Sequence, residues 1–119
     1  MNLFDKYGGQ DFWYFLIKDF YKKIIVSPII KDYFRGKDMS HIEEMLLGVI
    51  EVVLINYSHF DENAMQDYHK HLKIQEDEFD EWLSIFRQNL KDHSITDSDT
   101  LYIINTLTHY RPYIVQTSS

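Results

Sequence analysis

The feature that most constrains the fold of this chain is an apolar stripe at helical spacing. Between Asp11 and Val26, large side chains follow one another at intervals of three and four residues: Trp13, Leu16, Ile17, Phe20, Tyr21 and Ile24. This spacing places all of them on one face of an α-helix and predicts that the face is buried. No stretch of strict apolar–polar alternation bounded by turn residues is present, so the sequence predicts an all-α fold.

Two short helices are predicted beside this long one. Asn2 is expected to cap an opening helix that ends at Gly8-Gly9, where paired glycines allow backbone conformations that other residues avoid. Ser27-Pro28 is expected to cap and start a helix of one or two turns that ends at Gly36.

The rest of the chain predicts further helices. A capping box at residues 40–43 should open a helix with the apolar residues Ile42, Met45, Leu46, Val49, Ile50, Val53 and Leu54. A polar loop at 56–63 and a short helix precede a long helix with Phe79, Trp82, Leu83, Phe86 and Leu90. The last helix carries Ile103, Leu107, Tyr110 and Ile114. Pro112 should kink it or end it early, because proline lacks the N–H that would bond to Thr108, and residues 117–119 should form a frayed tail.

Charge and composition exclude several classes of function. The chain fits one domain, residues 1–119, and its net charge of −7 comes without the clustered Lys and Arg that nucleic-acid binding needs. The absence of cysteine excludes thiol catalysis, iron–sulfur clusters and disulfides. The richest apolar window, residues 45–55, is too short to span a bilayer, and the first residues lack a signal-peptide pattern. We therefore expect a soluble cytoplasmic protein that binds neither nucleic acid nor membrane.

His69 is the candidate site residue. On a short helix, Met65, Tyr68, His69 and Leu72 fall at i, i+3, i+4 and i+7, so the imidazole lies within an apolar stripe. A neutral imidazole is a suitable axial ligand for haem iron, and the backbone carbonyl of Met65 could accept the other ring N–H and fix the tautomer. The alternative is a packed core histidine with a satisfied hydrogen bond. The sequence of this helix alone is compatible with both interpretations, a haem ligand and a core residue.

The order and spacing of these features resemble the truncated haemoglobins, short globins with a two-over-two helical sandwich around a haem crevice. The matching residues, which cover nearly the whole chain, are Leu3 to Gly9, Phe20, Tyr21, Phe34, His69, Phe79 and Trp82. Trp82 is typical of the second and third groups of that family, whereas Gly8-Gly9 and Phe34 fit the first group. Many members also have a second Gly-Gly after the distal helix, where this chain reads Ile55-Asn56-Tyr57.

The resemblance implies haem b as the cofactor and His69 as the proximal ligand of its iron. Tyr21 and Trp82 are then expected to donate hydrogen bonds to a ligand on the other face of the iron. His71 is expected to reach solvent or a haem propionate, and His41 a propionate edge. The residues expected to contact haem are Phe34, Met39, Ile42, Met45, Leu46, Met65, Tyr68, Leu72, Ile74 and Phe79.

The function that the resemblance implies is reversible binding of O2, NO and CO. NO dioxygenase or peroxide chemistry supported by an external reductase is a further option. The alternative from a different class is a haem-free, globin-like helical module that serves as a sensor or protein-interaction surface. The sequence leaves the physiological ligand, the reductase and the oligomeric state open. The Met45 thioether lies on the distal helix, but a thioether is a weak ligand, so we expect no internal sixth ligand to the iron.

Overall fold

The computed structural model describes residues 1–56 and 60–115. Its helices are α1 (Leu3–Lys6), α2 (Gly9–Ile24), η1 (Lys31–Phe34), α3 (Met39–Ile55), α4 (Glu62–His69), η2 (Lys70–Leu72), α5 (Glu76–Asp92), α6 (Asp97–Thr108) and α7 (Arg111–Ile114), where η marks a 3-10 helix. Within these ranges, a single parallel bridge between Ile74 and Val115 is the only β-type pairing. The predicted all-α fold is confirmed.

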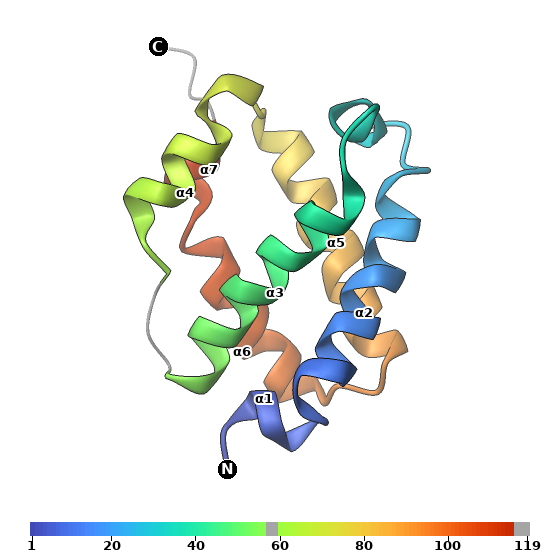
Figure 1. Ribbon diagram of the computed structural model, residues 1–119, viewed down its shortest axis with the longest axis vertical. Coiled ribbons are helices and arrows are strands. Elements are labelled where there is room, and N and C mark those ends of the chain that lie inside the picture. Colours follow the sequence, from blue (N-terminus) through green and yellow to red (C-terminus); the bar gives the residue numbers. More distant parts are fainter. Residues whose placement is uncertain (57–59, 116–119) are drawn as a thin grey trace.

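Two pairs of helices form two layers. In Figure 1, α2 and α3 run in opposite directions in front of α5 and α6. Packing joins α2 to α3 within one layer, α5 to α6 within the other, and α2 to α5 between the layers. This arrangement is the expected two-over-two sandwich. None of the helices in the described part of the chain is both long enough and apolar enough to cross a membrane.

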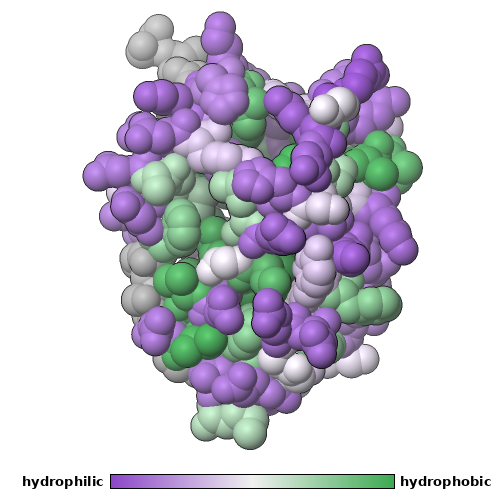
Figure 2. All heavy atoms as spheres, in the orientation of Figure 1, coloured by the Kyte–Doolittle hydropathy of each residue, from purple (hydrophilic) through white to green (hydrophobic). Residues whose placement is uncertain are grey.

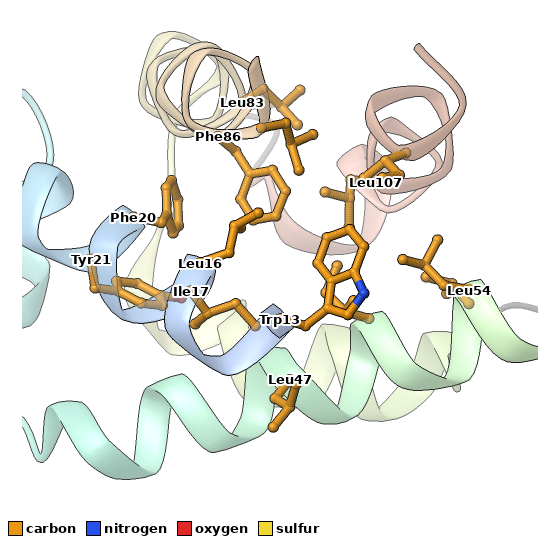
Figure 3. Close-up of a cluster of buried hydrophobic side chains, with 14 of the residues drawn as sticks. Trp13, Leu16, Ile17, Phe20, Tyr21, Leu47, Leu54, Leu83, Phe86 and Leu107 are labelled. Carbon is orange, nitrogen blue, oxygen red and sulfur yellow. The ribbon is translucent and has the colours of Figure 1, made fainter. Parts of the chain in front are cut away.

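Helix α2 supplies the centre of the core. All residues of its predicted stripe are buried. Figure 3 shows the stripe residues from Trp13 to Tyr21 in one cluster with Leu83 and Phe86 of α5 and Leu47 and Leu54 of α3. The helix begins and ends two residues earlier than predicted. Gly8 has a φ of 128°, and a Cβ there would lie 2.9 Å from the Cβ of Phe12, so only glycine fits this turn between α1 and α2.

Ser27 does not cap a helix, contrary to prediction. Residues 28–30 form a turn, and the 3-10 helix η1 begins only at Lys31. The Ser27 side chain is buried and its hydroxyl donates a hydrogen bond of 2.9 Å to Glu81 of α5. The Ser27 hydroxyl, which would have capped a local helix, is therefore engaged by Glu81, a residue far along the chain.

The start of α3 also differs from the predicted capping box at residues 40–43. The helix begins at Met39, and the side chain of Asp38 accepts a hydrogen bond of 3.3 Å from the backbone N–H of His41. Asp38 provides a better cap than Ser40 because its carboxylate also lies favourably at the positive end of the helix dipole.

The second half of the chain follows the prediction more closely. Asp61 caps α4 through the backbone N–H groups of Asn63 and Ala64, so this helix begins inside the polar loop predicted at 56–63. Helix α6 ends at Thr108, and Pro112 lies in the first turn of α7, where its missing N–H is not needed. Proline therefore ends the last long helix as predicted. Residues 117–119, predicted as a tail, lie outside the described ranges.

Candidate functional site

A cavity of about 710 Å³ lies between α3 and α4 and is closed at its sides by η1, α5 and the C-terminal helices. Figure 2 shows the face of the molecule over α3 and α4, where apolar atoms are visible between hydrophilic side chains. The volume lies within the range of roughly 300–1,000 Å³ that is typical of small-molecule and cofactor sites. Twelve of the thirteen residues predicted for the site line it: Tyr21, Phe34, Ile42, Met45, Leu46, Met65, Tyr68, His69, Leu72, Ile74, Phe79 and Trp82.

Met39 is the predicted site residue that lies elsewhere. It lines a separate, smaller pocket together with Ile25 and Arg35. Because Asp38 rather than Ser40 caps α3, Met39 is the first residue of the helix. Its side chain lies beside Ile25, just after the end of α2, and does not line the larger cavity.

Several cavity residues were not singled out from the sequence. Val49, Leu107, Tyr110 and Ile114 belong to predicted apolar stripes, but a stripe does not distinguish a packed core from a cavity wall. Gly48 lies within α3 and lines the cavity, and a Cβ there would meet no atom within 4 Å. A glycine in the middle of a helix, beside open space, has no explanation in the packing of the protein alone.

His69 is held in one orientation and one tautomer. Its Nδ1 lies 2.8 Å from the backbone carbonyl of Met65, one turn earlier, which is the hydrogen bond expected from the sequence. A carbonyl only accepts, so Nδ1 carries the proton and Nε2 has the lone pair that can bind a metal. Burial, aided by the nearby charge of His71, lowers the pKa of His69, so the ring is neutral and competent as a ligand near pH 7.

Helix α4, which carries His69, is polar and is held mainly from outside the central core. Met65 is its buried residue, and it packs with Val49 and Tyr110 in a cluster separate from the core around α2. The Tyr110 hydroxyl accepts a hydrogen bond of 2.5 Å from the N–H of Phe60 and lies 3.3 Å from the carbonyl oxygen of the same residue. Figure 1 shows α4 beside α7. The wall that carries the imidazole is therefore positioned by the last residues of the described chain.

A second set of contacts joins α7 to the start of α5. The guanidinium of Arg111 lies 2.5 Å from a carboxylate oxygen of Glu76 and 2.6 Å from one of Asp80. The bridge between Ile74 and Val115 adds backbone contact beside these ion pairs. These contacts close the end of the cavity at which Ile74 and Phe79 lie.

Tyr21 and Trp82 form a polar pair on the opposite wall. The Tyr21 side chain is only 6% exposed, and the indole of Trp82 lies near its hydroxyl. Burial raises the pKa of Tyr21 well above its usual value, and the neighbouring indole N–H of Trp82 opposes that shift only in part. The hydroxyl therefore keeps its proton and can donate to a ligand in the cavity. Ring contacts of Tyr21 with Phe20 and Phe34, at 4.9 and 5.7 Å between centroids, fix its orientation.

The cavity fits a flat, largely apolar cofactor that carries one open metal position. Protein interiors are close-packed, and a void lined by side chains such as Ile42 and Leu46 costs stability unless a ligand fills it. One neutral imidazole faces this space, as do the aromatic rings of Phe34 and Phe79. Lys37, His41 and His71 lie at its rim, where their N–H groups can meet the carboxylates of a cofactor. Haem has all of these properties, so the residues fit it.

Comparison with known proteins gives consistent matches. The sequence matches the family described as "Bacterial-like globin" over residues 2–115. It is 26% identical over 96 residues to a group 1 truncated hemoglobin of Tetrahymena thermophila, which is 81% of this chain and 79% of that protein. The Fe(III) structure of the truncated hemoglobin from Tetrahymena pyriformis has a TM-score of 0.86 at 22% identity and covers 98% of this chain and 100% of its own. The group II truncated hemoglobin of Bacillus anthracis has a TM-score of 0.83 at 18% identity, covering 100% and 94% respectively.

Proposed function

This chain belongs to the bacterial-like globin family and is a truncated haemoglobin, a haem-binding globin, and from that premise we propose that it holds haem through His69 and reversibly binds O2 and other diatomic ligands such as NO and CO. The observation that carries the proposal is the orientation of His69. Its Nδ1 is engaged by the Met65 carbonyl at 2.8 Å, which leaves Nε2 for a metal on the cavity side of α4.

The cavity wall supplies the rest of the haem pocket. Ile42, Met45 and Leu46 of α3 cover the face opposite His69, and Leu72, Ile74 and Phe79 lie on the side of His69. These apolar side chains exclude water from the ring of the cofactor, and Gly48 leaves space beside α3. Ferrous haem, when bound, supplies the iron to which a diatomic ligand binds.

The polar pair of Tyr21 and Trp82 then sets how long a ligand stays. A bound ligand whose outer atom carries partial negative charge accepts hydrogen bonds from the Tyr21 hydroxyl and the indole N–H. Ile42 and Leu46 donate nothing, so the polar stabilisation on this face comes from those two residues. The pocket therefore favours O2, which builds up negative charge, over CO, which does not.

Reconstitution with hemin tests the proposal. The purified protein should take up one hemin and show a strong Soret band, and His69→Gly should weaken binding and change the spectrum. Added imidazole should restore the spectrum of His69→Gly, because a free imidazole can occupy the space left by the side chain. His71→Gly is the matched control for iron coordination: His71 is exposed at the rim two residues away, so its loss should leave the Soret spectrum of bound haem unchanged.

Two outcomes would contradict the proposal. A folded, colourless protein that refuses hemin would favour the haem-free interaction module instead. An unchanged Soret band and unchanged hemin affinity in His69→Gly would show that haem binds without this ligand.

A further inference from the structure

We propose that Tyr33 and Glu78 form a redox site in the cavity wall, through which small phenolic donors return single electrons to the haem after it has reduced a peroxide. The site is distinct from the ligand-binding pair of Tyr21 and Trp82. The inference rests on the proposed function, because the haem is the oxidant of Tyr33.

The two side chains form a short hydrogen bond between η1 and α5. The Tyr33 hydroxyl donates to Oε1 of Glu78 at 2.6 Å, and both residues line the cavity. The same Oε1 accepts the backbone N–H of Gln75 at 2.8 Å as part of the capping box of α5, which holds the carboxylate in place. Tyr33 is half-buried, so it contacts the cavity and is also reached from solvent.

A neighbouring carboxylate is what a redox-active tyrosine requires. A phenol that loses an electron becomes a very strong acid, so oxidation is favourable only when a base takes the proton in the same step. Burial and the Glu78 carboxylate raise the pKa of Tyr33 to about 12, so the phenol is protonated until it is oxidised. On oxidation, the proton of Tyr33 moves to Glu78 in the same step in which the electron moves to the haem.

The electrons and protons balance as follows. A bound haem would supply the two electrons that, together with two protons, convert hydrogen peroxide into two water molecules. Tyr33 then loses one electron to the haem, its O–H bond breaks, and the proton moves to Glu78. A phenolic donor gives one electron to the Tyr33 radical, and Glu78 returns the proton. A second donor molecule supplies the second electron in the same way, and each donor is left as its own radical after loss of one proton to solvent.

Among the described residues, Tyr33 combines two properties that other tyrosines have separately. Tyr21 lines the cavity, but the polar group near its hydroxyl is the indole N–H of Trp82, which is not a base. Tyr7 donates to the carboxylate of Asp99 at 2.5 Å, but it does not line the cavity. Tyr7 is therefore a matched control for the pairing with a carboxylate alone.

The test uses the hemin-reconstituted protein mixed with hydrogen peroxide, rapid freezing and electron paramagnetic resonance. The expected tyrosyl signal is lost in Tyr33→Phe and kept in Tyr7→Phe. A nitroso spin trap, followed by peptide mass spectrometry, should mark Tyr33. Glu78→Gln keeps a hydrogen-bond acceptor and removes the base, so the radical should form on the order of a hundredfold more slowly, the low end of what a positioned proton acceptor contributes.

Each outcome decides between the two proposals. A Soret band with an undiminished tyrosyl signal in Tyr33→Phe, or a spin-trap adduct on another tyrosine alone, overturns this inference and leaves haem binding intact. A Glu78→Gln variant that forms the radical at the wild-type rate rejects the role of the carboxylate. Absence of the Soret band in the wild-type protein rejects the proposed function, and this inference with it.

Discussion

Replacing Tyr21 with phenylalanine isolates the contribution of one hydroxyl group to ligand binding. The ring keeps its contacts with Phe20 and Phe34, and the site is almost completely buried, so little besides the hydroxyl should change. A hydrogen bond to a partly charged acceptor contributes about 1.5–3 kcal/mol, and every 1.4 kcal/mol is about a tenfold change in an equilibrium or rate. Because the indole N–H of Trp82 remains as a second donor, we expect the lower end, about a tenfold faster O2 dissociation.

Stopped-flow displacement measures this effect. O2 release from the ferrous protein is followed in excess CO, and CO release in excess NO, for wild type, Tyr21→Phe, Trp82→Phe and the double variant. The double-mutant cycle gives the coupling between the two donors. CO dissociation should change much less than O2 dissociation, because the outer atom of CO carries little charge.

Equal acceleration of O2 and CO release would refute the reasoning, because it would mean that Tyr21 acts through packing and not through a hydrogen bond.

Four further predictions follow from other parts of the structure. Burial lowers the pKa of His69 below its usual 6.5, so the unfolded chain binds this proton at higher pH than the folded one. The stability that neutral His69 contributes to the haem-free protein is complete above pH 6.5 and is lost as the pH falls below it. The free energy of unfolding, measured by urea titration at a series of pH values, should therefore change less steeply with pH in His69→Leu. Gly48→Ala should stabilise the haem-free protein by about 0.5–1 kcal/mol in urea unfolding, because a Cβ meets no atom within 4 Å, and a loss of stability would contradict the open space described there. The ferrous protein should show a broad five-coordinate visible band, and split low-spin bands that Met45→Leu abolishes would identify an internal ligand. Tyr110→Phe should destabilise the protein by about 1 kcal/mol, because it removes the hydrogen bonds to the part-buried backbone groups of Phe60, and thermal unfolding with and without hemin would measure it.

The parts of the structure that the sequence predicted depend on neighbours along the chain. The stripe from Trp13 to Ile24 is set by the 3.6-residue period of one helix, and it is buried as expected. The hydrogen bond from His69 to Met65 joins residues four apart, so helix geometry alone places the two groups together. Pro112 ends α6 for an equally local reason.

The parts that the sequence did not predict depend on residues far apart along the chain. The Ser27 hydroxyl binds Glu81, and the Tyr33 hydroxyl binds Glu78, at separations of 54 and 45 residues. The periodic spacing of apolar residues does not indicate which distant residues form hydrogen bonds with each other. Met39 likewise lies beside Ile25, fourteen residues earlier in the chain, a neighbour that the spacing within its own helix does not indicate.

The dependence of α4 on Tyr110 and α7 has a consequence for the order of events during synthesis. His69 leaves the ribosome some forty residues before Tyr110, so the helix that carries it emerges without the cluster that holds it in place. Until residues 110–115 have emerged, α4 lacks its contacts with Tyr110 and α7, although α5 and α6 have already left the ribosome. If haem binds through His69 as proposed, its capture therefore follows translation of the C-terminal helices, and a nascent chain stalled before Tyr110 lacks the contacts that hold α4 in place.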